Sequence, residues 1–174
     1  MAPLLFLRVF LPFALGSFIS YFFRNVNAII ETDLVRDLGF SAASLGLLTS
    51  VYFISFASFQ LPLGLLLDRF GPRRTESVLL IFAALGALIF SLAESLSGLI
   101  LGRLLIGFGV SACLMASFKA YVLWFPPDRL PLMNGLQMVA GGLGAMSATV
   151  PLRTALEFTD WRGVFLILSG LTLL

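Results

Sequence analysis

No charged side chain occurs between Phe40 and Leu67, so this stretch must lie in apolar surroundings. A helix needs about 20 predominantly apolar residues to cross a bilayer, and this stretch is longer than that. Hydrophobic residues make up 59% of the chain and charged residues 11%, against about half and about a quarter in soluble domains. We therefore predict an all-α, polytopic transmembrane helix bundle.

The same rule makes residues 1–174 one transmembrane unit with short polar connections. Ser41 and Asp160 are expected helix N-caps, and Pro126 ends an apolar run because a following Pro127 cannot continue the helix. We expect no carboxylate clearly inside a span. The expected spans are 9–30, 42–67, 76–94, 97–125 and 130–153, followed by an incomplete span over 161–174.

Composition argues against several common kinds of site. The chain has no histidine and one cysteine, Cys113, which removes the usual zinc ligands, a triad base and an internal disulfide. We therefore expect no enzyme, no cofactor and no metal site. Lys119 is the only lysine, so the charge needed to bind nucleic-acid phosphates is also missing.

The arginines of the connections are divided unequally between the two sides of the predicted bundle. Cytoplasmic loops carry the excess of Lys and Arg, so we predict an inside N-terminus. The expected localisation is the cytoplasmic (inner) membrane, as a multi-pass protein. Expected inside are Arg8, Arg69, Arg73, Arg74 and Arg129, and expected outside are Arg36, Arg153 and Arg162.

A charged loop separates the second and third predicted spans, with the sequence Gly64-Leu-Leu-Leu-Asp68-Arg69-Phe-Gly71-Pro-Arg73-Arg74. Asp68 lies at the negative end of a helix dipole, so it needs a specific partner. A positive-inside loop with a tight turn at Gly71 would account for the basic residues alone. It would not account for the glycines, the acid and the basic pair together.

This spacing resembles the loop 2–3 signature of the major facilitator superfamily of secondary transporters. The resemblance implies the N-terminal six-helix half of a major facilitator fold with a truncated sixth helix, and a missing C-terminal half as partner. It also implies that Asp68, Arg69 and Arg73 latch the outward-open state against that second half. The gating residues implied are Gly64, Asp68, Arg69, Gly71, Arg73 and Arg74.

Polar side chains form a stripe along the first predicted span. Three- and four-residue spacing places on one helix face Ser17, Ser20, Arg24, Asn27 and Glu31. The planar fork of an arginine can hold a carboxylate or a phosphate, and ionisable groups inside a span are functional candidates. We predict that Arg24, Asn27 and Ser20 bind substrate together with the adjacent Tyr21. The alternative is that Arg24 reaches the outer surface or pairs with Glu31.

The segment Tyr21-Phe-Phe-Arg24 also resembles the Tyr-x-x-Arg stretch of organophosphate:phosphate antiporters, in which the arginine faces the substrate phosphate. Those antiporters follow the arginine with lysine and have a degenerate loop 2–3, whereas this chain has Asn25 and an intact loop. The resemblance implies an organic anion, as in a sugar-phosphate permease-like member, and no particular compound.

The segment Gly102-Arg103-Leu-Leu-Ile106-Gly107 resembles the superfamily's fourth-helix pattern, whose arginine is linked to proton coupling, although Ile106 stands where glutamine is usual. We predict a coupling or gating role for Arg103; the alternative is an arginine held by lipid headgroups. On a straight helix Lys119 lies about 160° around from Arg103. The sequence leaves Lys119 open between the substrate cavity and the cytoplasmic interface.

Small residues dominate the fifth predicted span, where they allow close helix packing. Gly135 and Gly144 have the first spacing of the superfamily's antiporter motif, but Ala148 and Thr149 stand where Gly-Pro is expected. Symport, antiport and uniport therefore stay undecided.

Two polar residues and one short motif complete the candidate set. Tyr52 of the second span and Gln137 of the fifth are further candidates for substrate binding. Asp160-Trp161-Arg162 resembles the family's usual entry to the sixth helix, with the indole as an interfacial anchor.

Together these patterns predict secondary active transport of a small, anionic organic solute by alternating access, which needs the missing half. The alternative is a non-transporting membrane subunit or a truncated remnant of a transporter. The expected partners are the lipid bilayer, the organic solute and a coupling ion, either a proton or another ion. No nucleic acid is expected.

Overall fold

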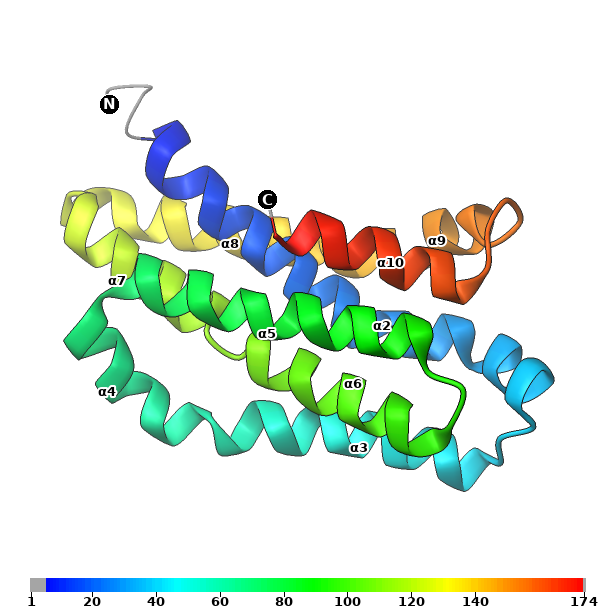
Figure 1. Ribbon diagram of the computed structural model, residues 1–174. Coiled ribbons are helices and arrows are strands. Elements are labelled where there is room, and N and C mark those ends of the chain that lie inside the picture. Colours follow the sequence, from blue (N-terminus) through cyan, green and yellow to red (C-terminus); the bar gives the residue numbers. More distant parts are fainter. Residues whose placement is uncertain (1–5, 174) are drawn as a thin grey trace.

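The computed structural model describes residues 6–173, which form a bundle of helices joined by short turns (Figure 1). The predicted all-helical fold class is confirmed. Leu174, the last residue of the expected sixth span, lies outside the described residues. The elements are a π-helical turn η1 (Phe6–Phe10), α2 (Leu11–Leu38), α3 (Ala42–Ser58), α4 (Gln60–Phe70), α5 (Pro72–Leu92), α6 (Leu96–Gly109), α7 (Cys113–Trp124), a 3-10 turn η2 (Pro127–Arg129), α8 (Leu130–Ser147), α9 (Val150–Ala155) and α10 (Trp161–Thr172).

The two ends of the bundle carry different charges. The chain enters at the end that also holds the α4–α5 and α7–α8 connections, on the left of Figure 1. We call this the arginine-rich end, after Arg8, Arg69, Arg73, Arg74 and Arg129. The opposite end holds the α2–α3 and α5–α6 connections, and we call it the acidic end, after Glu31, Asp33, Asp37, Glu94, Glu157 and Asp160.

Several helices have the length and hydropathy of membrane-spanning helices. Three helical stretches among residues 6–173 are long and apolar enough, namely Phe6–Leu38, Pro72–Leu92 and Leu96–Trp124. Helices α3 and α4 pass the same test as one span bent by 46°. Helix α10 is apolar but shorter.

The two largest differences from the expected helix boundaries are at the end of α2 and the start of α5. Helix α2 continues past residue 30 to Leu38, where Gly39 closes it in the left-handed conformation (φ 67°). Helix α5 begins at Pro72 and not at residue 76, because proline is suited to the first helical position, where its missing N–H has no role. Gly71, with φ 79°, makes the turn that a side chain would strain.

Three of the expected spans are interrupted. The second is bent between α3 and α4, which places Pro62 in the first turn of α4, where a missing N–H breaks no helical hydrogen bond. The fifth is divided between α8 and α9, and Pro151 again falls in a first turn. The fourth is interrupted over residues 110–112, and the Ser111 carbonyl accepts a 3.1 Å hydrogen bond from Gln60 Nε2.

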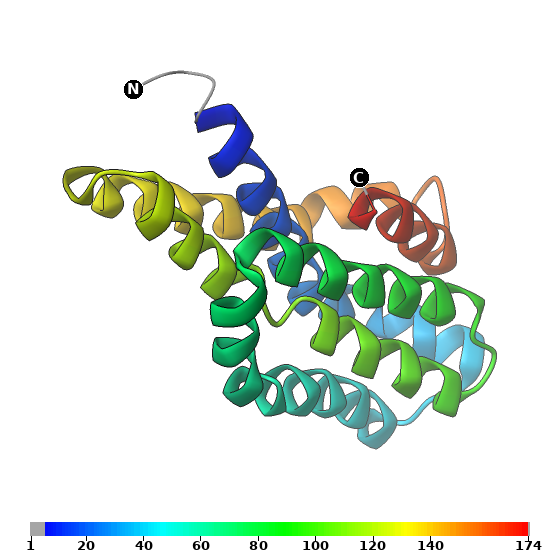
Figure 2. The same cartoon turned by 60° about the vertical axis from the view of Figure 1, so that its left-hand side comes forward.

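Glycines bring neighbouring helices close together. A side chain at Gly107 would collide with the Tyr52 backbone of α3, and one at Gly109 would collide with Ala83 of α5. On the other side of the bundle, Gly144 of α8 lies against the Phe18 carbonyl of α2. Figure 2 shows the resulting division: α5 and α6 run side by side, while α7 and α8 extend together toward the arginine-rich end.

The apolar core has two parts. One cluster lies toward the acidic end and includes Phe23, Phe90 and Phe165. The other lies toward the arginine-rich end and includes Phe13, Leu67 and Tyr121. The interruption at residues 110–112 falls where the two clusters meet, since Val110 and Cys113 belong to the first and Ala112 to the second.

Candidate substrate and coupling sites

Arg24 lies near the middle of the long first helix, among aromatic rings. Its guanidinium carbon is 4.9 Å from the Tyr21 ring centroid, 5.1 Å from that of Phe56 and 5.9 Å from that of Phe53. Its Nε is buried without a hydrogen-bond partner, and Arg24 forms no ion pair within residues 6–173, with Glu31 or any other acid. The rings of α2 and α3 thus hold a cation whose charge no anion of the described residues neutralises.

Tyr52 of α3 is a second polar group without a partner at this level of the bundle. Only 2% of the residue is exposed, and its buried hydroxyl has no hydrogen-bond partner among the described residues. Arg24 and Arg103 are the cations closest to that hydroxyl. Buried polar groups are normally paired, so two unpartnered ones on facing helices mark a place where a polar ligand can bind.

Asn27 and Arg103, predicted for different roles, are brought together. Arg103 is 1% exposed; it donates from Nη1 to the Phe23 carbonyl at 3.0 Å and from Nη2 to Asn27 Oδ1 at 2.5 Å. The amide of Asn27 donates to Thr49 Oγ1 at 2.8 Å. In this conformation Arg103 is a buried link between helices, stacked on the Phe90 and Phe165 rings at 5.0 and 5.5 Å, and not an interfacial arginine.

Gln137 forms a second buried link, nearer the arginine-rich end. Its carbonyl accepts from the Tyr121 hydroxyl at 2.5 Å, and its amide donates to the Phe13 carbonyl at 3.1 Å and to Ser17 Oγ. The side chain joins α2, α7 and α8 with no exposed surface. Ser20 is also buried on α2. The structure therefore separates Gln137 from the aromatic surroundings of Arg24.

Asp68 forms an ion pair within this chain. Its carboxylate pairs with the ammonium of Lys119, which is the partner that its unfavourable position on α4 requires. The pair lies at the arginine-rich end, with 76% of the Asp68 side chain and 29% of the Lys119 side chain exposed. Because the fourth span is interrupted before α7, the rotation calculated for a straight helix does not apply to Lys119.

The remaining signature residues surround the α4–α5 turn. Arg69 stacks on the adjacent Phe70 ring at 5.3 Å. Arg73 and Arg74 line a cavity of about 650 Å³ together with Arg8. An added Cβ at Gly64 would meet nothing within 4 Å, so this face of α4 is open.

One functional candidate was not predicted from the sequence. Glu76 lies inside α5 and is 5% exposed, which corrects the expectation that no carboxylate lies clearly within a span. It was expected at the first residue of the third span, at the membrane surface, because the helix was expected to start four residues later than it does. The sequence did contain the signal: Pro72 after a glycine is a typical helix start.

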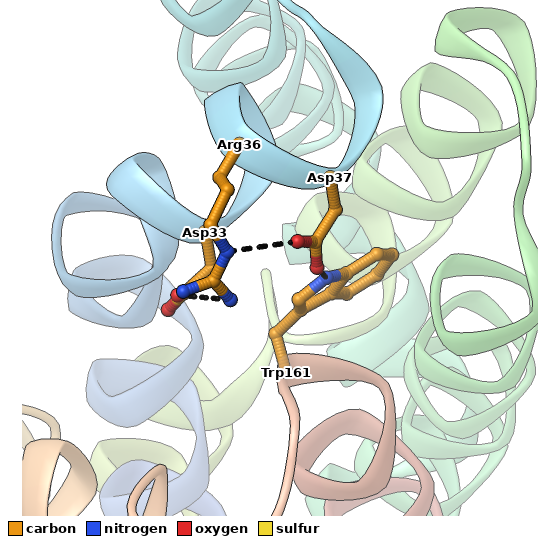
Figure 3. A network of polar contacts seen from close by, with 4 residues as sticks. All are labelled: Asp33, Arg36, Asp37 and Trp161. Carbon is orange, nitrogen blue, oxygen red and sulfur yellow. Dashed lines mark hydrogen bonds and ion pairs between the residues drawn. The ribbon is translucent and has the colours of Figure 1, made fainter.

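A network of polar contacts at the acidic end connects α2 with α10 (Figure 3). Arg36 pairs with Asp33 and with Asp37, each at 3.1 Å, and the Trp161 indole donates to Asp37 at 3.1 Å. The indole is 1% exposed and lies against the Phe90 ring, so the expectation of an interfacial anchor was wrong. The expected N-cap was correct, since Asp160 accepts from the Gly163 N–H at 2.7 Å.

Comparison with known proteins identifies related transporters. Residues 13–174 match the model of the Major Facilitator Superfamily. The nitrate/nitrite transporter NrtP of Picosynechococcus sp. is 36% identical over 114 residues, which are 66% of this chain and 21% of that protein. A probable L-galactonate transporter of Escherichia coli K12 is 28% identical over 160 residues, covering 88% of this chain and 34% of that protein. The hexuronate transporter of the same bacterium is 26% identical over 158 residues, covering 91% and 37%. The chain thus spans only 21% to 37% of the length of these relatives.

Proposed function

Because this chain belongs to the Major Facilitator Superfamily and is an integral membrane protein, we propose that it forms the N-terminal half of a secondary active transporter for a small organic anion. In this proposal a second half completes the transporter, and the two halves rock about a site near the middle of the membrane. The arginine-rich end and the N-terminus face the cytoplasm, in the inner membrane.

The surroundings of Arg24 are the observation that supports an anionic substrate. A guanidinium near mid-membrane is costly unless an anion, water or aromatic faces compensate it, and here only the aromatic faces belong to the protein. A substrate carboxylate or phosphate would supply the missing charge through paired hydrogen bonds, and the unpartnered Tyr52 hydroxyl would orient it. The named substrates of the relatives support an anion, since nitrate, L-galactonate and hexuronate are all anions, and the last two are organic.

The signature loop supplies the gating part of the proposal. In the conformation described, Asp68 is paired with Lys119 of the same half. In the alternate state Asp68, Arg69 and Arg73 contact the second half, and the open face of α4 at Gly64 gives that half room to approach. Arg103 holds α2 and α6 together while the halves move.

Uptake by the full-length transporter, reconstituted in lipid vesicles, tests the substrate class. We expect Arg24→Ala to abolish uptake of organic anions and Arg24→Lys to retain weak uptake, because lysine keeps the charge and loses the fork. Arg153→Ala, which removes an exposed arginine of α9 that forms no ion pair among the described residues, is the matched control. Unchanged transport of every tested anion by both Arg24 variants would exclude an anion held by Arg24. Absence of transport by the wild-type protein would favour the non-transporting alternative.

A further inference from the structure

Glu76 is a buried carboxyl that the proposed substrate and gating sites do not use. It lies in the second turn of α5 with 5% of its surface exposed, and its Oε1 has no hydrogen-bond partner within residues 6–173. The carboxyl occupies the space beside Gly16 of α2, because an added Cβ at Gly16 would collide with Oε1. The same added Cβ would lie 3.7 Å from Cys113 Sγ of α7. Helices α2, α5 and α7 therefore enclose the carboxyl.

No cation faces this carboxyl from any described element packed against α5. From α7 the titratable groups nearest the carboxyl are the Cys113 thiol and the Tyr121 phenol, and neither carries a positive charge. The one cation of α7, Lys119, is paired with Asp68. The charged residues of α4 nearest the turn, Asp68 and Arg69, are exposed, and so are Arg73 and Arg74 in the first turn of α5 itself. On α2 the facing residue is a glycine.

The arginines of α6 and α10 are bound at the opposite end of α5. Arg103 of α6 stacks on the Phe90 ring, and Arg162 of α10 donates to the Ser91 carbonyl at 2.9 Å. Phe90 and Ser91 lie in the last turn of α5, whereas Glu76 lies in its second turn. Neither arginine can neutralise the Glu76 carboxyl in this conformation.

An unpaired carboxylate in such a place costs several kcal/mol, and binding a proton removes that cost. Glutamine or leucine would fill the same space without the cost of burying an ionisable group, so a role for the carboxyl is expected. The position of Glu76 relative to α7 indicates this role. Cys113 directly follows the interruption of the fourth span at residues 110–112, where the two apolar clusters meet. A movement of α7 about this interruption would bring water to the carboxyl.

We propose that Glu76 is the proton-binding site of the transporter, protonated in the conformation described and releasing its proton to water when α7 moves away from α2 and α5. The carboxylic acid then becomes a carboxylate, and the proton goes to water on the side to which the site has opened. This role rests on the proposed transport function, because it makes the coupling ion a proton. It gives the acid a function separate from substrate binding at Arg24.

Carbodiimide labelling tests the protonation without any transport. Dicyclohexylcarbodiimide reacts with protonated carboxyls in apolar surroundings: the acid adds across a C=N bond and its proton passes to nitrogen. Peptide mass spectrometry of the purified full chain in detergent should find the adduct on Glu76 at neutral and mildly alkaline pH. The exposed Asp68 of the same sample is the internal control and should stay unlabelled. Absence of an adduct on Glu76 at neutral pH would overturn the proposal.

Two variants separate proton binding from a packing role. Glu76→Gln keeps the shape of the protonated acid and should fold, but it should lose the adduct and the protonated-carboxyl band in the infrared spectrum. Gly16→Ala pushes the carboxyl from its place and should change the labelling yield at Glu76 while leaving Asp68 unlabelled. Labelling that Gly16→Ala leaves unaltered would contradict the assigned position of the acid.

Transport by the full-length protein tests coupling. With Glu76→Gln, accumulation of substrate driven by an imposed pH gradient should be lost, and counterflow exchange, which needs no net proton movement, should fall by a smaller factor. Glu94→Gln, which changes an exposed acid at the acidic end, is the matched control. Gradient-driven accumulation retained by Glu76→Gln would overturn the coupling role and leave the anion proposal intact. Failure of Arg24 variants to affect uptake would leave the labelling result intact.

Discussion

Arg103 of α6 and Asn27 of α2 are joined by a 2.5 Å hydrogen bond from the guanidinium Nη2 to the amide oxygen. The amide nitrogen of Asn27 continues the link to Thr49 of α3. A single uncharged side chain thus holds a fully buried cation and ties three helices together. The two residues have to be considered as one unit when either is mutated.

Replacing Asn27 by leucine should destabilise the protein, because Arg103 would keep its charge and lose an acceptor. Leaving a buried donor unsatisfied costs about 1–3 kcal/mol. Unfolding of the purified protein in mixed micelles measures the loss. The matched control is Asn25→Leu, since Asn25 donates only within its own helix, to the Tyr21 carbonyl. A loss no larger than that of Asn25→Leu would contradict the link.

Replacing Gln137 by leucine should have a comparable effect at the other end of the bundle. The Tyr121 hydroxyl and Ser17 would both lose their partner, at about 1 kcal/mol or more for each neutral hydrogen bond. Asn134→Leu on the same helix should be neutral or stabilising, because the buried Asn134 Oδ1 has no partner to lose among the described residues. The two variants are compared by thermal unfolding in detergent. Equal melting temperatures would show that the Gln137 bonds do not hold the helices.

The contact between α2 and α8 depends on Gly144. Gly144→Ala should force the helices apart, since the new Cβ would collide with the Phe18 backbone, and overpacking of this kind costs about 1–3 kcal/mol. Gly142→Ala is the control: nothing lies within 4 Å of its Cβ position, and alanine favours helix by up to about 1 kcal/mol. Thermal unfolding should therefore rank Gly142→Ala above wild type and Gly144→Ala below it. The reverse order would exclude the close approach.

The pair of Asp68 and Lys119 should matter for transport far more than for stability. Exposed ion pairs contribute less than about 1 kcal/mol, so Asp68→Asn and Lys119→Gln should unfold almost as the wild type does. Both should lower uptake by the full-length transporter if the pair is part of the gate. Exchanging the two residues, Asp68→Lys with Lys119→Asp, should restore part of the uptake. A double variant no better than either single one would show that the pairing itself is not used.

The helical fold could be predicted from the sequence because a helix that crosses lipid needs a long apolar stretch, and such stretches are visible in the sequence. The uncharged run from Phe40 to Leu67 does become helix, in α3 and α4. The bend between them and the interruption at residues 110–112 could not be predicted in the same way. Both depend on which neighbour takes the freed backbone groups, as Gln60 does for the Ser111 carbonyl.

The candidate site was predictable only in its residue types. Spacing along α2 places Ser17, Arg24 and Asn27 on one face, but it does not say what that face meets. Ser17 and Asn27 are bonded to other helices, and Arg24 is left with aromatic rings. Glu76 escaped prediction for a different reason, since four residues of helix before it were read as loop.

Gln60 and Asp68 both lie on α4, one at its start and one near its end. Gln60 reaches Ser111 in the interruption of the fourth span, and Asp68 reaches Lys119 of α7. The Gln60 bond is made at the level where both spans are interrupted, and the Lys119 pair is made beyond it. The second and fourth spans are thus joined both at their interruptions and beyond them, and a rotation of α4 about Phe59 would act on α7 through the Asp68–Lys119 pair. The bend in one span is thereby connected to the interruption in the other.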